Sequence, residues 1–105
     1  NVWVDLCWAW SIDPFSSADF VRRFIHTVPV NKLFGFGGDT GWPTSSAAYA
    51  IQMRHWFTRA MESEVAEGLL TEQQATRIAS QIMHDNQYDC FDVEGTRRNI
   101  AAAAA

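Results

Sequence analysis

The sequence predicts an α/β fold in which two parallel strands are joined through a helix. A short apolar run occupies residues 2–7, an amphipathic helical pattern follows within residues 16–28, and a second apolar run occupies residues 32–36. A strand, a helix and a second strand in close succession are typical of a βαβ unit, whose crossover is right-handed.

Composition sets the broad class. The 105 residues are 48% hydrophobic and 19% charged, which is enough apolar material to form a core and excludes disorder. No apolar run approaches the roughly 20 residues of a membrane span. The net charge of −4 disfavours nucleic-acid binding. Cys7 and Cys90 lack metal or redox spacing, so we expect reduced thiols and a cytoplasmic protein.

The first half of the chain divides into alternating strands and helices. Residues 2–7 are β-branched and aromatic, as in a strand buried on both faces. A loop is expected over residues 8–15, with Asp13-Pro14 as a turn. Ser16 or Ser17 would cap the helix that Pro29 stops. The second strand, residues 32–36, leads into a diglycine.

The second half is predicted to be helical. A loop at residues 41–46 precedes a long helix at 46–67, with Gly68 just beyond its end. Its apolar stripe predicts core packing and comprises Tyr49, Met53, Trp56, Phe57, Ala60, Met61 and Val65. A capping box from Thr71 to Gln74 predicts another helix at 72–86. Near the end of the long helix we expect a solvated acidic face formed by Glu62, Glu64 and Glu67. After the second helix we expect an irregular tail at residues 88–100.

Two features indicate a piece of a longer protein. Two adjacent parallel strands leave faces and edges that need partners. The sequence also opens inside an apolar run, and it closes on five alanines, residues 101–105, which we interpret as placeholders or an expression scar. We therefore assign residues 1–100 to part of one domain and set residues 101–105 apart.

Asp39 is the leading candidate for chemistry. It follows Gly37-Gly38 just past the carboxyl end of a predicted parallel strand, where ligand and catalytic groups collect in α/β sheets and barrels. A carboxylate there can bind a metal or accept a proton from metal-bound water, and we expect it to face a cavity. The alternative from the pattern alone is a turn residue that caps the local backbone.

Other candidates give weaker signals. Trp8, Trp10 and Trp42 lie in the loops after the strands, where aromatic side chains either wall a substrate pocket or cover the core. Three histidines, His26, His55 and His84, lack metal-ligand spacing and are expected at a surface or interface. The segment Gly35–Gly38 lacks the third glycine of a dinucleotide loop, so a phosphate- or nucleotide-binding half-domain has the weakest support.

Three segments together resemble a known family. They are Asn-Val-Trp-Val-Asp-Leu-Cys-Trp at residues 1–8, Lys-Leu-Phe-Gly-Phe-Gly-Gly-Asp at 32–39 and the helical pattern from Leu70 to Asn86. They resemble the C-terminal part of amidohydrolase-superfamily metal-dependent hydrolases, closest to the amidohydrolase 2 and uronate isomerase branch. The resemblance covers residues 1 to about 93 and implies the last two βα units and C-terminal helix of a (β/α)₈ TIM barrel.

The resemblance also implies an activity. Asp39 occupies the position of the family's Asp that binds a divalent metal, commonly zinc, or takes a proton from the attacking water. The expected reaction is hydrolysis of a C–N, C–O or C–C bond in a small substrate, by the complete barrel only. The family's histidine ligands match none of His26, His55 and His84.

Two alternatives and several partners stay open. The same barrel supports isomerisation of a sugar acid, and a non-catalytic α/β interaction module would dock its apolar faces on a partner chain. Expected partners are a small-molecule substrate and the remainder of the barrel, with no nucleic acid and no membrane. A homo-oligomer stays open.

Overall fold

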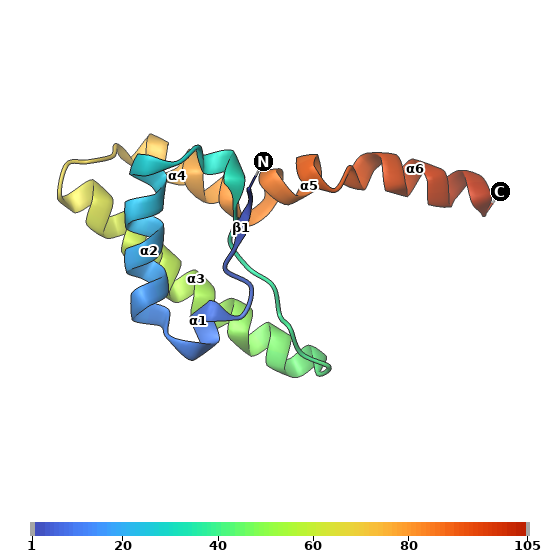
Figure 1. The fold of residues 1–105 in the computed structure, drawn as a ribbon, viewed down its shortest axis with the longest axis horizontal. Helices are drawn as coiled ribbons and strands as arrows, with labels where there is room; N and C mark the ends of the chain where they lie inside the picture. The colour runs from blue at the N-terminus through green and yellow to red at the C-terminus, as the bar shows by residue number, and fades with distance from the viewer. Residues whose placement is uncertain (1, 105) are drawn as a thin grey trace.

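The computed structural model describes residues 2–104, which form a mixed α/β structure that is mostly helical (Figure 1). The two strands are β1 (Val4–Asp5) and β2 (Leu33–Phe34). They pair in parallel, with Val4 opposite Leu33 and Asp5 opposite Phe34. The prediction of parallel strands joined through a helix is therefore confirmed.

Both strands are shorter than the apolar runs that predicted them. β1 ends because Asp5 Oδ1 accepts a hydrogen bond from the backbone N–H of Cys7, and Cys7 adopts a positive φ of 29°. The pairing nevertheless continues past the strand ends, since the N–H of Leu6 donates to the carbonyl of Phe34. Before β2, a 3₁₀ turn, η1 (Val30–Lys32), replaces the start of the predicted strand.

The connection from β1 to β2 contains two helices rather than a loop and one helix. α1 (Ala9–Ile12) lies within the predicted loop, and α2 (Pro14–Thr27) begins earlier than expected. Asp13, not a serine, caps α2, because its carboxylate accepts from the N–H of Ser16 at 3.0 Å. Pro14 fits the first helical position, where no N–H is needed. The predicted stop is confirmed, since α2 ends just before Val28 and Pro29.

The long helix α3 (Pro43–Ala66) also begins at a proline, three residues before the predicted start. Gly68, with a φ of 73°, takes the left-handed conformation expected after the helix. The capping box is confirmed: Thr71 Oγ1 accepts from the N–H of Gln74, whose side chain accepts from the N–H of Thr71.

After the capping box the chain stays helical almost to its end. α4 (Glu72–Ser80) continues into a π-helical turn, η2 (Gln81–Asp85), and then into α5 (Asn86–Cys90). α6 (Val93–Ala103) follows, so the prediction of an irregular tail was wrong. α6 projects from the other elements along the longest dimension of the chain, which measures 53 × 28 × 25 Å with α6 included (Figure 1).

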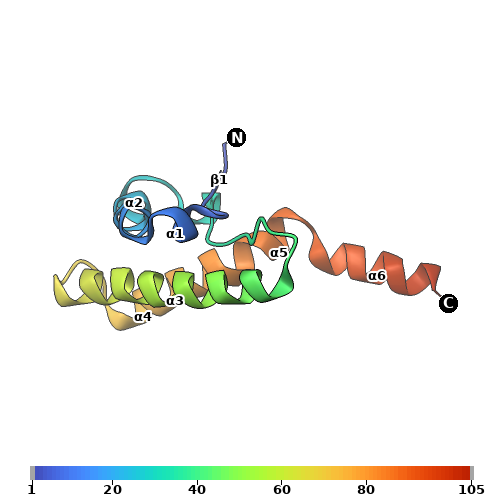
Figure 2. The ribbon, with the colours of Figure 1, turned by 90° about the horizontal axis from the view of Figure 1, so that it is seen from below.

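The core lies between two layers, with α1, α2 and the strands on one side and α3 and α4 on the other (Figure 2). The predicted stripe of α3 supplies much of it through Met53, Phe57, Ala60 and Met61, all buried. Trp10, Val21, Phe24, Leu33 and Ile82 complete it from other elements. Over the described residues, no helix has both the length and the apolar character to cross a membrane.

Candidate functional site

The loops that follow the two strands lie side by side at the carboxyl edge of the sheet. The backbone N–H of Gly37 donates to the carbonyl of Cys7 over 3.3 Å. A Cβ on Gly37 would lie 2.9 Å from Cys7 Sγ, which is closer than real Cβ contacts. Glycine is therefore required here by close approach. The backbone brings Cys7 and the diglycine segment together, as parallel pairing predicts.

Asp39 stands at the far end of this loop, exposed to solvent. Its φ of 39° lies in the left-handed region, which Asp and Asn tolerate better than other non-glycine residues. The segment before it is fixed against α3, because a Cβ on Gly38 would meet Ser46 Oγ at 2.5 Å. The loop thus holds Asp39 between the strand ends and the first turns of α3.

The charge of Asp39 reaches Cys7. Burial raises the pKa of the Cys7 thiol above its ordinary value of 9.0, and the carboxylates of Asp5 and Asp39 raise it further. Two carboxylates and a thiol therefore share this edge of the sheet. The thiol is protonated at neutral pH, so it is a poor nucleophile and a poor metal ligand in this state.

The three candidate tryptophans separate into two environments. Trp42 is 73% exposed and Trp8 is 42% exposed, so both remain open at this edge. Trp10 is 1% exposed, and its indole Nε1–H donates to the carbonyl of Gly35 at 2.8 Å. Trp10 therefore covers the core, because α1 directs its side chain inward. It does not belong to the predicted wall of a substrate pocket.

The described residues do not form a complete metal centre. Among residues 2–104, no three His, Cys, Asp or Glu side chains gather closely enough to hold an ion. A zinc site takes about four ligands, whereas this edge offers the exposed carboxylate of Asp39 beside a protonated thiol. The carboxylate is a suitable donor type, but the set is too small. The described side chains therefore do not fit a metal by themselves.

The histidines lie away from Asp39. His84 is exposed, pairs with Asp85 and stacks on Tyr88, with ring centroids 4.1 Å apart. His55 packs edge-on against Trp56 within α3. The expected surface or interface setting holds for both.

His26 takes part in a cluster that the sequence interpretation missed. Glu64, expected to be solvated, is 1% exposed. Its carboxylate accepts from Arg22 Nε and from His26 Nε2, each at 2.5 Å. Burial raises the pKa of Glu64, but the hydrogen bonds from His26 and Arg22 outweigh it and hold the pKa below its ordinary value of 4.5. The available signal was spacing: Glu64 continues the apolar series Met53, Phe57, Ala60 along one face of α3.

This cluster lies at the opposite end of α3 from the loop that contains Asp39. His26 is in the last turn of α2, and Glu64 is near the end of α3, which starts beside the loop after β2 and runs back (Figure 1). The cluster joins α2 to α3 and is assigned to folding rather than to the site.

Asp39, which was expected to face a cavity, is exposed to solvent. Two grooves are formed instead between α3 and the α4–η2 segment, with volumes of about 520 and 480 Å³, and Asp39 lines neither. Their walls come from the middle and end of α3, away from the strand ends.

Comparison with protein families, curated proteins and solved structures gives no match. The candidate site therefore rests on its geometry and on the resemblance of its sequence motifs.

Proposed function

We propose that this chain forms the last two βα units of a (β/α)₈ barrel in a metal-dependent hydrolase of the amidohydrolase type. One observation carries the proposal: Asp39 is held in a left-handed conformation directly after a diglycine at the carboxyl edge of a parallel strand pair. Non-glycine residues in this conformation are uncommon and gather at functional sites. The carboxyl edge is where barrels place their chemistry.

The strand pair supports a larger sheet. β1 and β2 pair only with each other among the described residues, so each has one open edge. Each strand in a barrel pairs on both sides, which removes such edges. In the proposed enzyme, further strands occupy both edges, and the groups facing Asp39 come from chain outside this sequence.

Each residue has a limited role in the proposal. Asp39 is the metal ligand or proton acceptor that this chain contributes, as the resemblance implies. Trp8 and Trp42 are the exposed aromatic residues on the flanking loops and would wall the substrate. The divalent metal, zinc in the first instance, needs ligands that the described residues lack. The substrate is a small molecule with a hydrolysable C–N, C–O or C–C bond.

The test is Asp39→Asn in the complete protein that carries this segment. Asn tolerates the left-handed backbone and removes only the charge. We expect turnover of a panel of amide and ester substrates to fall by about 10²–10⁴-fold, the range for loss of a general base. Asp89→Asn, an exposed residue on α5, is the matched control and should keep full turnover. Full activity of the Asp39 variant, with an unchanged thermal melt, would remove the assignment.

A sugar-acid isomerase built on the same barrel would differ from the proposed hydrolase only in the reaction that it catalyses. The Asp39 substitution should then reduce interconversion of uronates instead of hydrolysis, with the same Asp89 control. The hydrolase has priority because the resemblance implies hydrolysis for most of the family.

Exposed apolar side chains favour a non-catalytic interaction module as the second candidate. Phe15, Ile51 and Phe91 are each more than 60% exposed, although phenylalanine and isoleucine are among the residues most often buried. If the chain is an interaction module, we expect it to be stable and its melting temperature to be unchanged when zinc is added. The hydrolase predicts that zinc raises the melting temperature of the complete barrel and that Asp39→Asn reduces this rise.

A further inference from the structure

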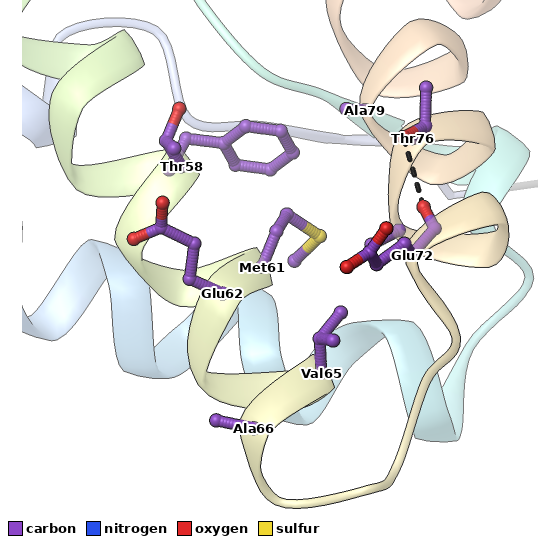
Figure 3. A pocket seen from close by; sticks show the side chains of 10 residues that line it. Thr58, Met61, Glu62, Val65, Ala66, Glu72, Thr76 and Ala79 are labelled. Carbon is purple, nitrogen blue, oxygen red and sulfur yellow. Dashed lines mark hydrogen bonds between the residues drawn. The ribbon is translucent and has the colours of Figure 1, made fainter.

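The larger groove, between α3 and α4, has apolar walls and an acidic rim. Met61 and Val65 of α3 point toward α4 across it, and Ala75 and Ala79 form the facing wall (Figure 3). The carboxylates of Glu62 and Glu72 stand at the rim. Alanine at the wall allows a further helix to approach closely, since interaxial distance depends on side-chain size.

The groove is poorly equipped for a small polar ligand. Ligand pockets combine apolar walls with a few convergent polar groups. Here Thr76 Oγ1 already donates to the carbonyl of Glu72 within α4, at 2.9 Å, and both rim acids are exposed (Figure 3). An apolar helix face with a basic neighbour is the better chemical match.

α6 presents such a face, and its contacts with the rest of the chain are mainly to α5, where Arg97 donates to Tyr88 Oη at 3.2 Å. The helix has 11 residues and projects from the body, where α5 is its neighbour (Figures 1 and 2). Isolated helices shorter than about 12–15 residues are marginal in water, and packing of an apolar face supplies most helix stability. Ile100, its largest aliphatic side chain after the first turn, is 65% exposed.

The charges of the two elements are complementary. Arg97 lies one turn before Ile100 on the same face of α6. Arg97 contacts Glu94 at 3.3 Å and donates to Tyr88 Oη at 3.2 Å, with its guanidinium 5.6 Å from the centre of the Tyr88 ring. Arg97 and Glu94 are both more than 60% exposed, so their ion pair contributes little to stability and can be exchanged for another surface pair. A basic and aliphatic helix face therefore matches an apolar groove with Glu62 and Glu72 at its rim.

We propose that the α3–α4 groove binds α6 of a second copy of this chain, and that the exchange is reciprocal in a two-fold dimer. A reciprocal arrangement fills both grooves and supports both projecting helices, which is how an isologous interface closes. Ile100 enters between Met61 and Ala75, and Arg97 lies toward Glu62. The contact is small, so a weak dimer is expected. This proposal is independent of the hydrolase assignment.

Sedimentation equilibrium of the 105-residue chain over a range of concentrations tests the dimer. Ile100→Asp should raise its dissociation constant by more than about tenfold, because it places a charge in the groove. Asn99→Asp adds the same charge at a neighbouring position off the docking face and should change the constant less than about twofold. Far-UV circular dichroism checks that both variants keep their helices.

A charge exchange and a local probe complete the test. Arg97→Glu or Glu62→Lys alone should weaken the dimer, and the two together should restore it. The methyl resonance of Met61 should shift with concentration, while that of Met53, which is fully buried elsewhere, should not. A chain that stays monomeric, a dimer that leaves Met61 unshifted, or growth beyond two copies would overturn the proposal.

Discussion

His26 Nε2 lies 2.5 Å from Oε2 of Glu64, and this contact joins the end of α2 to the end of α3 through a carboxylate that is 1% exposed. An ionised carboxylate only accepts, so His26 donates. Arg22, one turn earlier on α2, donates to the other oxygen. Two adjacent turns of one helix therefore donate hydrogen bonds to a single buried acid on the next.

Glu64→Gln should destabilise the chain by about 2–3 kcal/mol. Breaking a fully buried pair costs roughly 3–5 kcal/mol, and here Arg22 and His26 are partly exposed and can regain water. Urea unfolding followed by circular dichroism measures the loss. Glu67→Gln is the matched control, because Glu67 pairs with the same Arg22 at 2.7 Å but is 54% exposed. It should cost less than about 1 kcal/mol. Equal losses would contradict the burial argument.

Stability should fall in acid through the same group. The pKa of Glu64 is lower in the folded chain than its ordinary value of 4.5. Its contribution is therefore fully present above about pH 4.5 and is lost as the pH falls through the lower folded pKa. The neighbouring groups are Arg22, His26 and Glu67. Unfolding free energies measured from pH 7 to pH 3 should drop less steeply in Glu64→Gln than in the parent. If the unfolding free energies of the two proteins fell equally with pH, ionisation of Glu64 would not be the cause of the loss of stability in acid.

The placement of Asp39 can be tested through Cys7 without any activity. In a Cys90→Ser background Cys7 is the single thiol, and its alkylation rate against pH reports its pKa. Burial is the largest cause of the raised pKa of Cys7, and the charges of Asp5 and Asp39 raise this pKa further. Asp39→Asn should therefore lower the pH midpoint of the alkylation rate. Asp89→Asn should leave it unchanged. An unmoved midpoint in the Asp39 variant would mean that the two loops do not lie together.

The parallel strands, the connecting helix and the stripe of α3 could be predicted from the sequence because apolar periodicity dominates each of them. The lengths of the strands could not be predicted from the sequence, since they depend on contacts with residues far away in the chain. The chain before β2 is held by Asn86, a residue 53 positions away from Leu33. The sequence pattern of residues 32–36 contains no trace of that contact.

The candidate site was predictable in part for a similar reason. The diglycine and Asp39 lie at the strand edge, as local sequence indicated. The inward turn of Trp10 depends on α1, a four-residue helix too short for a periodic signal. Glu64 was misjudged because a carboxylate is exposed by default, and its burial depends on Arg22 and His26, which are about 40 residues earlier in the chain.

Trp10→Phe should cost about 1–2 kcal/mol or more, because it leaves the buried carbonyl of Gly35 without its donor and replaces the buried indole by a smaller aromatic ring. Chemical unfolding gives the loss. Trp8→Phe is the control: Trp8 is 42% exposed, and its substitution should change stability by less than about 0.5 kcal/mol. If Trp10→Phe were neutral, the indole bond would not fix α1 to the end of β2.

Asn86 is a buried polar residue that joins three elements of the fold. It is 4% exposed, and its side-chain amide donates to the carbonyls of Val30 at 2.9 Å and Leu33 at 2.8 Å. The π-helical turn before it supports the same region, because the carbonyl of Ile82 accepts from the N–H of Gly35. Asn86 thus fixes η1 and β2 against the helix that begins with it.

Asn86→Leu should therefore destabilise the chain by about 2–4 kcal/mol, since two carbonyls lose their donor and a larger side chain must fit a buried site. Urea unfolding measures the change. Asp85→Asn, at the preceding and 54% exposed position, breaks only the surface contact with His84 and should cost less than about 0.5 kcal/mol. Hydrogen exchange gives the local readout: the N–H of Leu6, which donates to Phe34, should lose protection in Asn86→Leu. Retained protection there would show that β2 keeps its position without the amide.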